Sequence, residues 1–295
     1  MKKIKLNAKK YKVAGFGEIL WDIYPDAKTL GGAPTNFAIH SHQLGADSFL
    51  ISSVGEDSLG KEAQRLLHDF GLDTSGIQVN KYFSTGRVEV KLDEMGNPSY
   101  KIDEESAWDF IRFDENLGNI CKLLDSLCFG TLVQRNPNSK RVLMKILDST
   151  PHNCLKVFDV NIRQEFYNKE IIKLFLERAD IVKMNQLEFH QITDIVYISQ
   201  EWKKGTISLI KEFDLKLVII TLGENGSILA TKNDYITHTP KNKVNVVSSV
   251  GAGDAYTASV VMGWLNQKPL NKIILEATNL ASYVCNFMGA IPPQK

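Results

Sequence analysis

Residues 155–184 read LKVFDVNIRQEFYNKEIIKLFLERADIVKM and contain the pattern that decides the fold. The stretch opens with a short apolar run, 155–160, which is typical of a buried strand. In 169–178, apolar residues recur three and four positions apart from Ile171 onward, as in an amphipathic helix. A second apolar run follows at 181–184. Strand, helix and strand in this order predict two parallel strands joined by a crossover helix.

The same alternation extends outward over most of the chain. Further buried strands are predicted at 12–16, 48–54, 127–133 and 216–222. Further helices are predicted at 34–44, 58–70, 115–127, 139–148, 204–213 and 252–265. The sequence therefore predicts an α/β fold, with a mostly parallel central sheet and helices on both faces. A run at 227–231 follows the strand at 216–222 so closely that we expect it to pair antiparallel.

Two regions break this rhythm. Residues 86–92 and 98–102 read as a hairpin, and 19–24 reads as a further exposed strand. These strands are not separated by helical patterns, so they do not fit the central sheet. We expect them to form a small β-sheet lid that is discontinuous in sequence, made of about 17–33 and 84–108.

Composition sets limits on the class of protein. Of 295 residues, 43% are apolar and 23% are charged, which is ordinary for a globular protein and excludes a disordered chain or a disulfide scaffold. The chain shows no internal repeat or linker, so 1–295 is predicted to be a single domain. Its net charge of +1 argues against nucleic-acid binding through bulk charge. Any anionic ligand must be bound by a local site.

Targeting and metal-binding signals are missing from the sequence. Residues 1–10 are basic but lack the apolar segment of a signal peptide, and no later stretch resembles a membrane span. We therefore expect a cytoplasmic protein that does not bind membranes. The cysteines and histidines show no metal-site spacing. Free, mostly buried thiols are expected at Cys121, Cys128, Cys154 and Cys285.

Two glycine-containing stretches resemble nucleotide-binding loops without matching them. Residues 13–20, VAGFGEIL, lack the third glycine of a dinucleotide fingerprint. Residues 55–62, GEDSLGKE, match a P-loop until Glu62, where a serine or threonine is required. The acidic residues of this stretch would also repel a polyphosphate. We interpret it as the start of a helix capped by Asp57 or Ser58.

A third stretch, Gly251-Ala252-Gly253-Asp254, predicts an anion site. It precedes a predicted helix, whose free amide groups and positive dipole end attract anions. The small residues let the main chain approach a ligand closely. The carboxylate of Asp254 could accept a proton from an attacking hydroxyl group or orient that group. An ordinary helix cap is the alternative interpretation.

Five motifs occur in order along the chain: 31–36 (GGAPTN), 159–163 (DVNIR), 185–188 (NQLE), 221–226 (TLGENG) and 251–254 (GAGD). From about Gly15 to Pro293 the sequence resembles the ribokinase-like (PfkB) family of carbohydrate kinases, most closely the bacterial fructokinases. Agreement of several motifs in order is far more specific than any one of them. The resemblance implies the ribokinase-like fold and transfer of phosphate from ATP to a sugar.

The resemblance implies sugar-binding positions at Asp22, Gly31, Gly32, Asn36 and Arg163. A carboxylate accepts hydroxyl hydrogen bonds, an amide both donates and accepts, and glycines let the main chain approach a sugar. Arg163 follows a predicted strand at the sheet edge where ligands of α/β folds collect, and its guanidinium suits a phosphate or the sugar. The alternatives are a strand-end carboxylate for Asp22, a helix-start residue for Asn36 and a surface ion pair for Arg163.

The family's nucleotide and metal positions also have counterparts. Asn185 and Glu188 resemble the motif that serves magnesium and phosphate, and one carboxylate, acting directly or through water, is sufficient for Mg²⁺. Helix capping is the alternative role for this pair. Lys183 shares a strand face with Asn185 and could reach the phosphates or be an ordinary sheet-edge lysine. The resemblance places ATP beside Thr221, Gly223, Gly226 and Asn279.

The sequence departs from many relatives at Ser248, where they carry an aspartate that several use for a monovalent cation. The sequence therefore does not support activation by potassium. Within the lid, Arg87 and Trp108 could contact the substrate or pack inside the lid itself.

These observations predict an ATP- and Mg²⁺-dependent carbohydrate kinase. Asp254 would be the catalytic base, and the amides of Gly251, Ala252 and Gly253 would stabilise the transferred phosphoryl group. D-Fructose, converted to fructose 6-phosphate, is the predicted acceptor. Ribose, 2-keto-3-deoxygluconate or a nucleoside is the alternative acceptor, and a non-catalytic sugar-binding regulator is the alternative function. The resemblance also implies a homodimer that pairs through the β lid.

Overall fold

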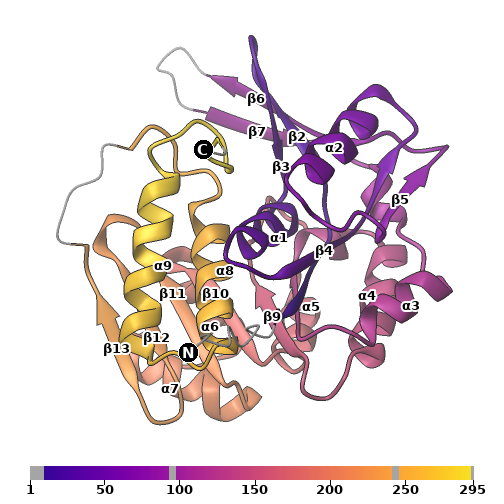
Figure 1. Ribbon diagram of the computed structural model, residues 1–295. Coiled ribbons are helices and arrows are strands. Elements are labelled where there is room, and N and C mark those ends of the chain that lie inside the picture. Colours follow the sequence, from indigo (N-terminus) through magenta and orange to yellow (C-terminus); the bar gives the residue numbers. More distant parts are fainter. Residues whose placement is uncertain (1–9, 93–97, 241–245, 294–295) are drawn as a thin grey trace, which may run out of the picture.

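The computed structural model describes residues 10–92, 98–240 and 246–293, which form two β-sheets with helices around them (Figure 1). The larger sheet has the spatial order β13 (Tyr235–His238), β12 (Ser227–Ala230), β11 (Leu217–Thr221), β10 (Ile181–Asn185), β9 (Leu155–Asp159), β8 (Ser126–Gly130), β1 (Lys12–Phe16), β4 (Asp47–Gly55) and β5 (Ile77–Asn80). Strands β11 to β5 run parallel, whereas β12 and β13 pair antiparallel. The predicted fold class, including the antiparallel end of the sheet, is confirmed.

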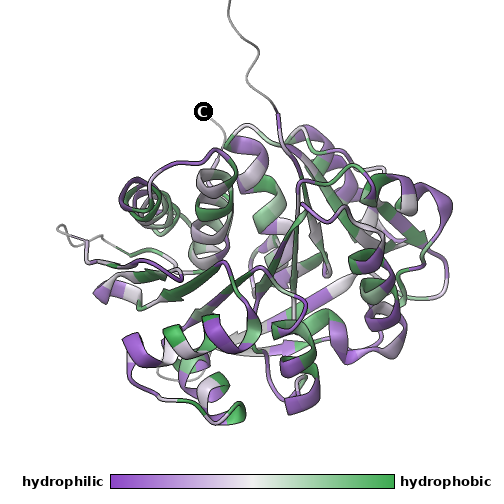
Figure 2. Ribbon diagram, turned by 90° about the horizontal axis from the view of Figure 1, so that it is seen from below, coloured by the Kyte–Doolittle hydropathy of each residue, from purple (hydrophilic) through white to green (hydrophobic). Residues whose placement is uncertain are grey.

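Helices cover both faces of the larger sheet. One face carries α1 (Ala33–Gln43), α2 (Ser58–Asp69), α8 (Ala252–Leu265) and α9 (Leu270–Val284). The other face carries α3 (Glu115–Cys121), α4 (Pro137–Ser149), α5 (Lys169–Leu176), α6 (Gln186–Ile195) and α7 (Trp202–Phe213). Figure 2 shows hydrophobic residues gathered along the strands between these two layers. The strands are therefore buried on both sides, which explains why they read as apolar runs rather than as alternating patterns.

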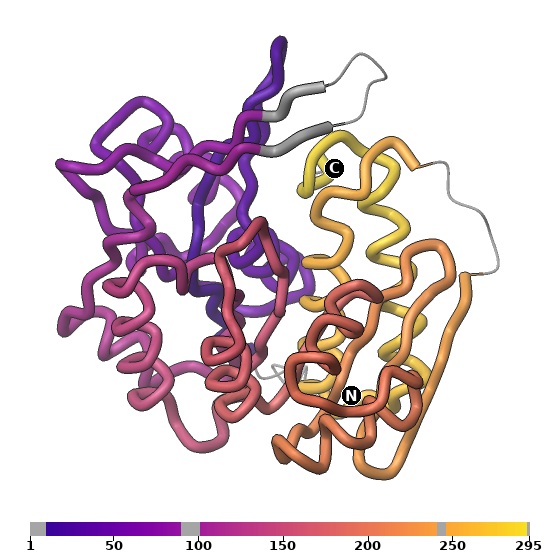
Figure 3. The backbone as a smooth tube through the Cα atoms, turned by 180° about the vertical axis from the view of Figure 1, so that it is seen from behind, coloured from indigo at the N-terminus to yellow at the C-terminus, as the bar shows by residue number. Residues whose placement is uncertain are grey.

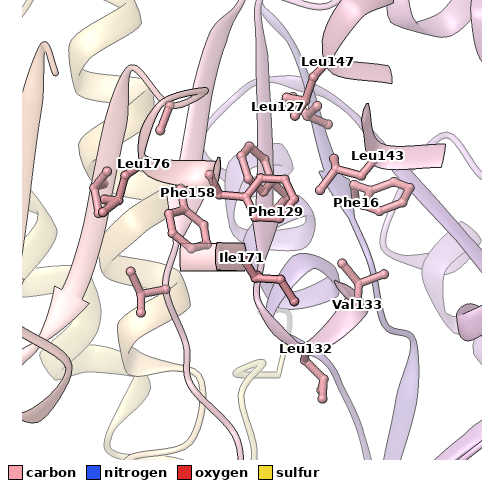
Figure 4. Close-up of a cluster of buried hydrophobic side chains, with 14 of the residues drawn as sticks. Phe16, Leu127, Phe129, Leu132, Val133, Leu143, Leu147, Phe158, Ile171 and Leu176 are labelled. Atoms are coloured by element: carbon pink, nitrogen blue, oxygen red, sulfur yellow. The ribbon is translucent and has the colours of Figure 1, made fainter. Parts of the chain in front are cut away.

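Successive side chains of each strand pack into different layers. Val13 belongs to the apolar cluster beneath α1, α8 and α9, whereas its neighbour Ala14 belongs to the cluster beneath α3 to α7. In the second cluster Phe129 and Phe158, on adjacent strands, stack with ring centroids 5.6 Å apart (Figure 4). Phe175 of α5 closes over both rings. This two-sided packing fixes which residues reach the edges of the sheet.

Two predicted elements end earlier than expected. The predicted strand 127–133 ends at Gly130, and a short 3₁₀ helix, η2 (Leu132–Arg135), follows it. The Thr131 hydroxyl donates to the carbonyl oxygen of Val160 at 2.8 Å, which turns the chain out of the strand. The predicted helix 115–127 is α3, which ends at Cys121 because the chain must turn back into β8.

The smaller sheet has the order β3 (Lys28–Gly31), β2 (Leu20–Ile23), β6 (Gly86–Leu92) and β7 (Pro98–Ile102). The hairpin of β6 and β7 is confirmed, but the prediction that 19–24 is exposed is wrong. The side chain of Trp21 is 2% exposed, and its indole N–H donates to the carbonyl oxygen of Leu59 in α2 at 3.1 Å. The base of this sheet is therefore part of the core.

The C-terminal segment lies beside the smaller sheet (Figures 1 and 3). A Cβ atom built on Gly289 would lie 3.2 Å from the Cγ2 atom of Thr29 in β3, and the carbonyl oxygen of Ala290 lies 3.0 Å from the Nε2 atom of His40. Among the described residues, no helix is long and apolar enough to cross a lipid bilayer.

A buried ion pair fastens the smaller sheet to the larger one. A 3₁₀ helix after β7, η1 (Ala107–Phe110), contributes Asp109, and η2 contributes Arg135. The two side chains are 1% and 6% exposed, and their Oδ2 and Nη2 atoms are 2.7 Å apart. The Arg135 guanidinium also stacks on Trp108, 4.0 Å from the ring centre. Because Trp108 is fully buried and Arg87 pairs with Asp103, neither lies in the cavity described below.

We predict that Asp109→Ala lowers the free energy of unfolding by about 3–5 kcal/mol, because it leaves the Arg135 charge buried without a partner. Urea unfolding followed by circular dichroism measures the change. Arg87→Ala is the matched control, because it breaks an ion pair whose arginine is 52% exposed. It should cost less than about 1 kcal/mol. Equal losses in the two variants would contradict the anchoring role of Asp109.

Candidate active site

A cavity of about 870 Å³ opens at the carboxyl ends of the parallel strands, between the two sheets and helices α1, α8 and α9. The residues that line it come from the loops after β1, β9, β10 and β11 and from the first turns of α1 and α8. The structure brings most of the sequence-predicted site residues to this cavity. They are Asp22, Gly32, Asn36, Arg163, Asn185, Glu188, Thr221, Gly223, Gly226, Gly251, Ala252, Gly253 and Asp254.

Two predicted site residues do not line the cavity. A Cβ atom on Gly31 would lie 2.8 Å from the Oδ2 atom of Asp22, so Gly31 makes room for that carboxylate across the β2–β3 pair. Asn279 is exposed, and the neighbouring face of α9, with Thr278 and Ala281, lines the cavity instead. Asn279 therefore does not reach the cavity as expected, because one residue turns a helix by about 100° and its side chain points away from the face that lines it.

Asp254 lies at the N-terminus of α8, next to the N-terminus of α1. Gly251 precedes α8 with φ 77°, and the main chain of Ala290 occupies the place that a Cβ atom there would need. A glycine is required for both reasons. The side-chain amide of Asn36 donates to the Oδ2 atom of Asp254 at 2.7 Å. The carboxylate is thus held at the positive ends of two helices.

Burial raises the pKa of Asp254 to about 6, and the nearby carboxylate of Asp159 acts in the same direction. Lys183, the Asn36 hydrogen bond and Arg163 oppose this shift. A carboxylate with this pKa is ionised above neutral pH, yet it binds a proton more strongly than an exposed aspartate does. These are the properties that a general base needs.

Glu18 is a cavity residue that the sequence did not reveal. It follows β1, is 4% exposed, and its Oε1 atom accepts a hydrogen bond from the main-chain N–H of Ala33 at 3.2 Å. Burial raises its pKa to about 7, and Asp254 contributes to the shift. One feature of the sequence could have pointed to Glu18. It is a glutamate directly after a predicted buried strand, in the stretch 13–20 that does not match a dinucleotide fingerprint.

Asp22 and Arg163 lie at the end of the cavity nearest the smaller sheet. The pKa of Asp22 is raised to about 6 by burial, and Arg163 acts to lower it. Arg163 also acts to lower the pKa of Glu18 and of Asp254, so its guanidinium faces all three carboxylates. Asn36 adds a carbonyl oxygen, Oδ1, that is buried and has no hydrogen-bond partner among the described residues. This end can therefore bind several hydroxyl groups.

The pair Asn185 and Glu188 forms a capping box at the start of α6, as the alternative interpretation proposed. The Asn185 side chain accepts from the Glu188 N–H at 2.9 Å, and the Glu188 Oε2 atom accepts from the Asn185 N–H at 2.7 Å. The Oε1 atom accepts from the N–H of Ile162 at 2.9 Å. Each oxygen atom can still accept a second bond, so capping leaves Glu188 able to interact with a cation through water.

The opposite end of the cavity is lined by small and weakly polar residues. Thr221, Gly223 and Gly226 come from β11 and the turn that follows it, and Thr278 and Ala281 come from α9. No charged side chain from these elements lines this end. Such a lining suits the flat, uncharged base of a nucleotide better than it suits a sugar.

Comparison with known proteins supports these assignments. Residues 2–295 match the pfkB family of carbohydrate kinases. A sugar kinase of Pyrococcus horikoshii is 30% identical over 301 residues, which cover 96% of this chain and 90% of that protein. Its crystal structure in complex with ATP superposes with a TM-score of 0.79 at 28% identity, covering 94% and 93% of the two chains.

Two further relatives differ in the activity that their names give. An ATP-dependent 6-phosphofructokinase of Thermoanaerobacterium thermosaccharolyticum is 26% identical over 306 residues, 98% of this chain and 92% of that protein. A fructokinase of Escherichia coli is 26% identical over 264 residues, 85% of this chain and 84% of that protein. The family match spans nearly the whole chain, and the ribokinase-like fold expected from the motifs is present. The protein therefore belongs to the pfkB family of carbohydrate kinases.

Proposed function

We propose that this protein transfers the γ-phosphoryl group of ATP to a hydroxyl group of D-fructose, giving fructose 6-phosphate. The observation that carries the proposal is the position of Asp254. A half-buried carboxylate with a raised pKa lies between a hydroxyl-binding end and a glycine turn at a helix N-terminus, all in one cavity. The match to a fructokinase and the ATP-bound relative support the choice of substrates.

In the proposed reaction the sugar is held by Asp22 and Asn36, with Arg163 beside it. The hydroxyl oxygen forms a bond to the γ-phosphorus while the bond to the bridging β–γ oxygen breaks, so the products are the sugar phosphate and ADP. The hydroxyl proton passes to the Asp254 carboxylate. The main-chain N–H groups of 251–253, at the start of α8, stabilise the negative charge on the transferred group. The N–H of Ala252, which donates to the carbonyl oxygen of Ser249 at 3.3 Å, would exchange that bond for the phosphoryl group.

ATP is proposed to place its base near Thr221, Gly223 and Gly226 and its phosphates against the start of α8. Magnesium would neutralise charge on the β- and γ-phosphates, with Glu188 interacting directly or through water. The described residues contain no group of three or more histidine, cysteine or acidic ligands suited to a metal. In the proposal, phosphate oxygens and water supply the other ligands of the ion. The Ser248 hydroxyl accepts the N–H of Val250 at 3.2 Å, and we expect no potassium requirement.

The smaller sheet contributes Leu20, Asp22, Val88 and Ile102 to the cavity. We propose that this lid, formed within the single catalytic domain, excludes water from the sugar end. Water is a competing acceptor of the phosphoryl group, so exclusion favours transfer to the sugar. Cytoplasmic location and pairing of two chains through their lids remain predictions from the sequence.

We predict that Asp254→Asn lowers kcat by about 10²–10⁴-fold, because the substituted amide keeps the shape but cannot accept the proton. The affinity for ATP should change little, since the helix amides are untouched. A coupled ADP-release assay measures kcat, and calorimetric titration measures ATP binding. Asp26→Asn, at an exposed residue in the turn between β2 and β3, is the control. Near-normal turnover in the Asp254 variant would remove that residue from the chemistry.

The pH profile should show an acid limb that reflects the coupled carboxyls. Because Asp254 must be ionised to accept a proton, kcat/KM should fall as the pH drops through the range of about 6 to about 7 that Asp254 and Glu18 span. In Glu18→Gln the limb should move to lower pH, since a negative neighbour is lost. An acid limb near pH 4 in the unmodified enzyme, the range of an ordinary carboxyl, would contradict this mechanism.

A panel of acceptors should identify the sugar. We expect the highest kcat/KM for D-fructose, and lower values for ribose, 2-keto-3-deoxygluconate, a nucleoside and fructose 6-phosphate. ADP release is measured with each acceptor, and with ATP alone as the blank. If another acceptor gave the highest kcat/KM, the proposed sugar would be wrong but the proposed kinase activity would stand. Thermal stabilisation by a sugar without ADP release from any acceptor would instead favour the non-catalytic regulator.

A further inference from the structure

Lys183 is a buried cation beneath the start of α8. It is the central residue of β10, and its direct register partner on β9 is Asp159. The neighbours Ile181 and Val157 pack into the cluster beneath α8 and α9, so the alternation of side chains directs Lys183 and Asp159 to the same face. The Nζ atom lies 3.0 Å from the Asp159 Oδ1 atom, and the two side chains are 7% and 5% exposed.

The ammonium group lies beside the glycine turn. The nearest atom to a Cβ built on Gly253 would be the Lys183 Nζ atom, at 3.1 Å. The partner carboxylate is turned toward a later point of the same helix, because its Oδ2 atom accepts a bond from the Thr257 hydroxyl at 3.3 Å. The positive end of this ion pair therefore lies beside the turn that precedes Asp254, and its negative end lies further along α8.

Positive charge is scarce around the cavity. Among the described residues that line it, only Lys183 and Arg163 are cationic, and Arg163 is exposed at the sugar end. Burial alone would lower the pKa of Lys183, but the carboxylates of Asp159, Glu188 and Asp254 outweigh it and raise the pKa. Lys183 thus remains charged throughout the working pH range.

We propose that Lys183 is a positioning residue for phosphoryl transfer, whose ammonium group, held by Asp159 against Gly253, supplies the fixed positive charge behind the anion-binding turn. This inference rests on the proposed function. Negative charge spreads over the oxygen atoms of the phosphoryl group in the transition state. A cation that is already fixed in a buried place does not have to move when that charge develops. It therefore stabilises the transition state more strongly than it stabilises the bound substrates.

The competing explanation is that Lys183 only neutralises Asp159. The double variant Lys183→Met with Asp159→Asn separates the two explanations. It removes both charges together, keeps the side-chain lengths and leaves an oxygen atom for Thr257. Asp159 raises the pKa of Asp254 and Lys183 lowers it, so the double variant also removes two opposite influences on that pKa. Because these two influences oppose each other, the double variant disturbs the base less than either single variant does.

We expect the double variant to melt within a few degrees of the unmodified enzyme and to lose about 10- to 100-fold in kcat, with KM for the acceptor changed less than about threefold. Coupled assays and differential scanning calorimetry measure these quantities. Lys216→Met is the control, because Lys216 pairs with Asp180 at 2.8 Å outside the cavity. It should leave kcat unchanged. A double variant with kcat within about threefold of normal overturns the inference.

Gly253→Ala tests the same contact without altering a charge, in case the double variant does not fold. Its φ is not in the left-handed region, so the added methyl group is tolerated by the main chain but displaces the ammonium group. We expect kcat to fall about tenfold with the melting temperature retained; an unchanged kcat contradicts the inference. Asp254→Asn is assayed in parallel. Normal activity in that variant removes Asp254 from the chemistry, and no ADP release from the unmodified enzyme rejects the proposed function itself.

Discussion

The hydrogen bond between Asn36 and Asp254 is the constraint on which the site depends. It joins residues 218 positions apart, each in the first turns of a helix that begins after a glycine with positive φ, 109° at Gly32 and 77° at Gly251. Both helices start at the edge where the parallel strands end. The two turns can meet only if every strand between them is in register, so the cavity is a product of the whole sheet rather than of its local motifs.

The cavity concentrates negative charge at a cost to stability. Burial raises the pKa values of Glu18, Asp22 and Asp254 to about 7, 6 and 6. A carboxyl group whose pKa is higher in the folded than in the unfolded chain lowers the free energy of unfolding as the pH rises. The loss begins near the pKa of the unfolded chain and is complete above the pKa of the folded chain. At neutral pH this cost is largely present. The two apolar layers around the larger sheet offset it, and the ionised groups are then available to bind hydroxyl groups and protons.

Much of this arrangement could be predicted from the sequence, because strong periodicity and ordered motifs are local signals. The helix 252–265 has the predicted bounds. Strand β3 could not be predicted from so few apolar residues, since it depends on pairing with β2. Glu18 and Lys183 are buried because their partners, Ala33 and Asp159, come from other elements. Asn279 belongs to a helix that borders the cavity, but the packing of that helix decides which of its faces lines the cavity.

The four thiols differ in the access that a reagent has to them. Cys121, Cys128 and Cys154 are buried, and burial raises the pKa of each thiol, so they are poor targets for alkylation. Burial raises the pKa of Cys285 as well, but this thiol is partly exposed and lines the end of the cavity proposed for the nucleotide base. A small fluorescent maleimide would accordingly label this position selectively, and bound nucleotide would slow the labelling. The chain thus carries a native reporter of occupancy that needs no engineered cysteine.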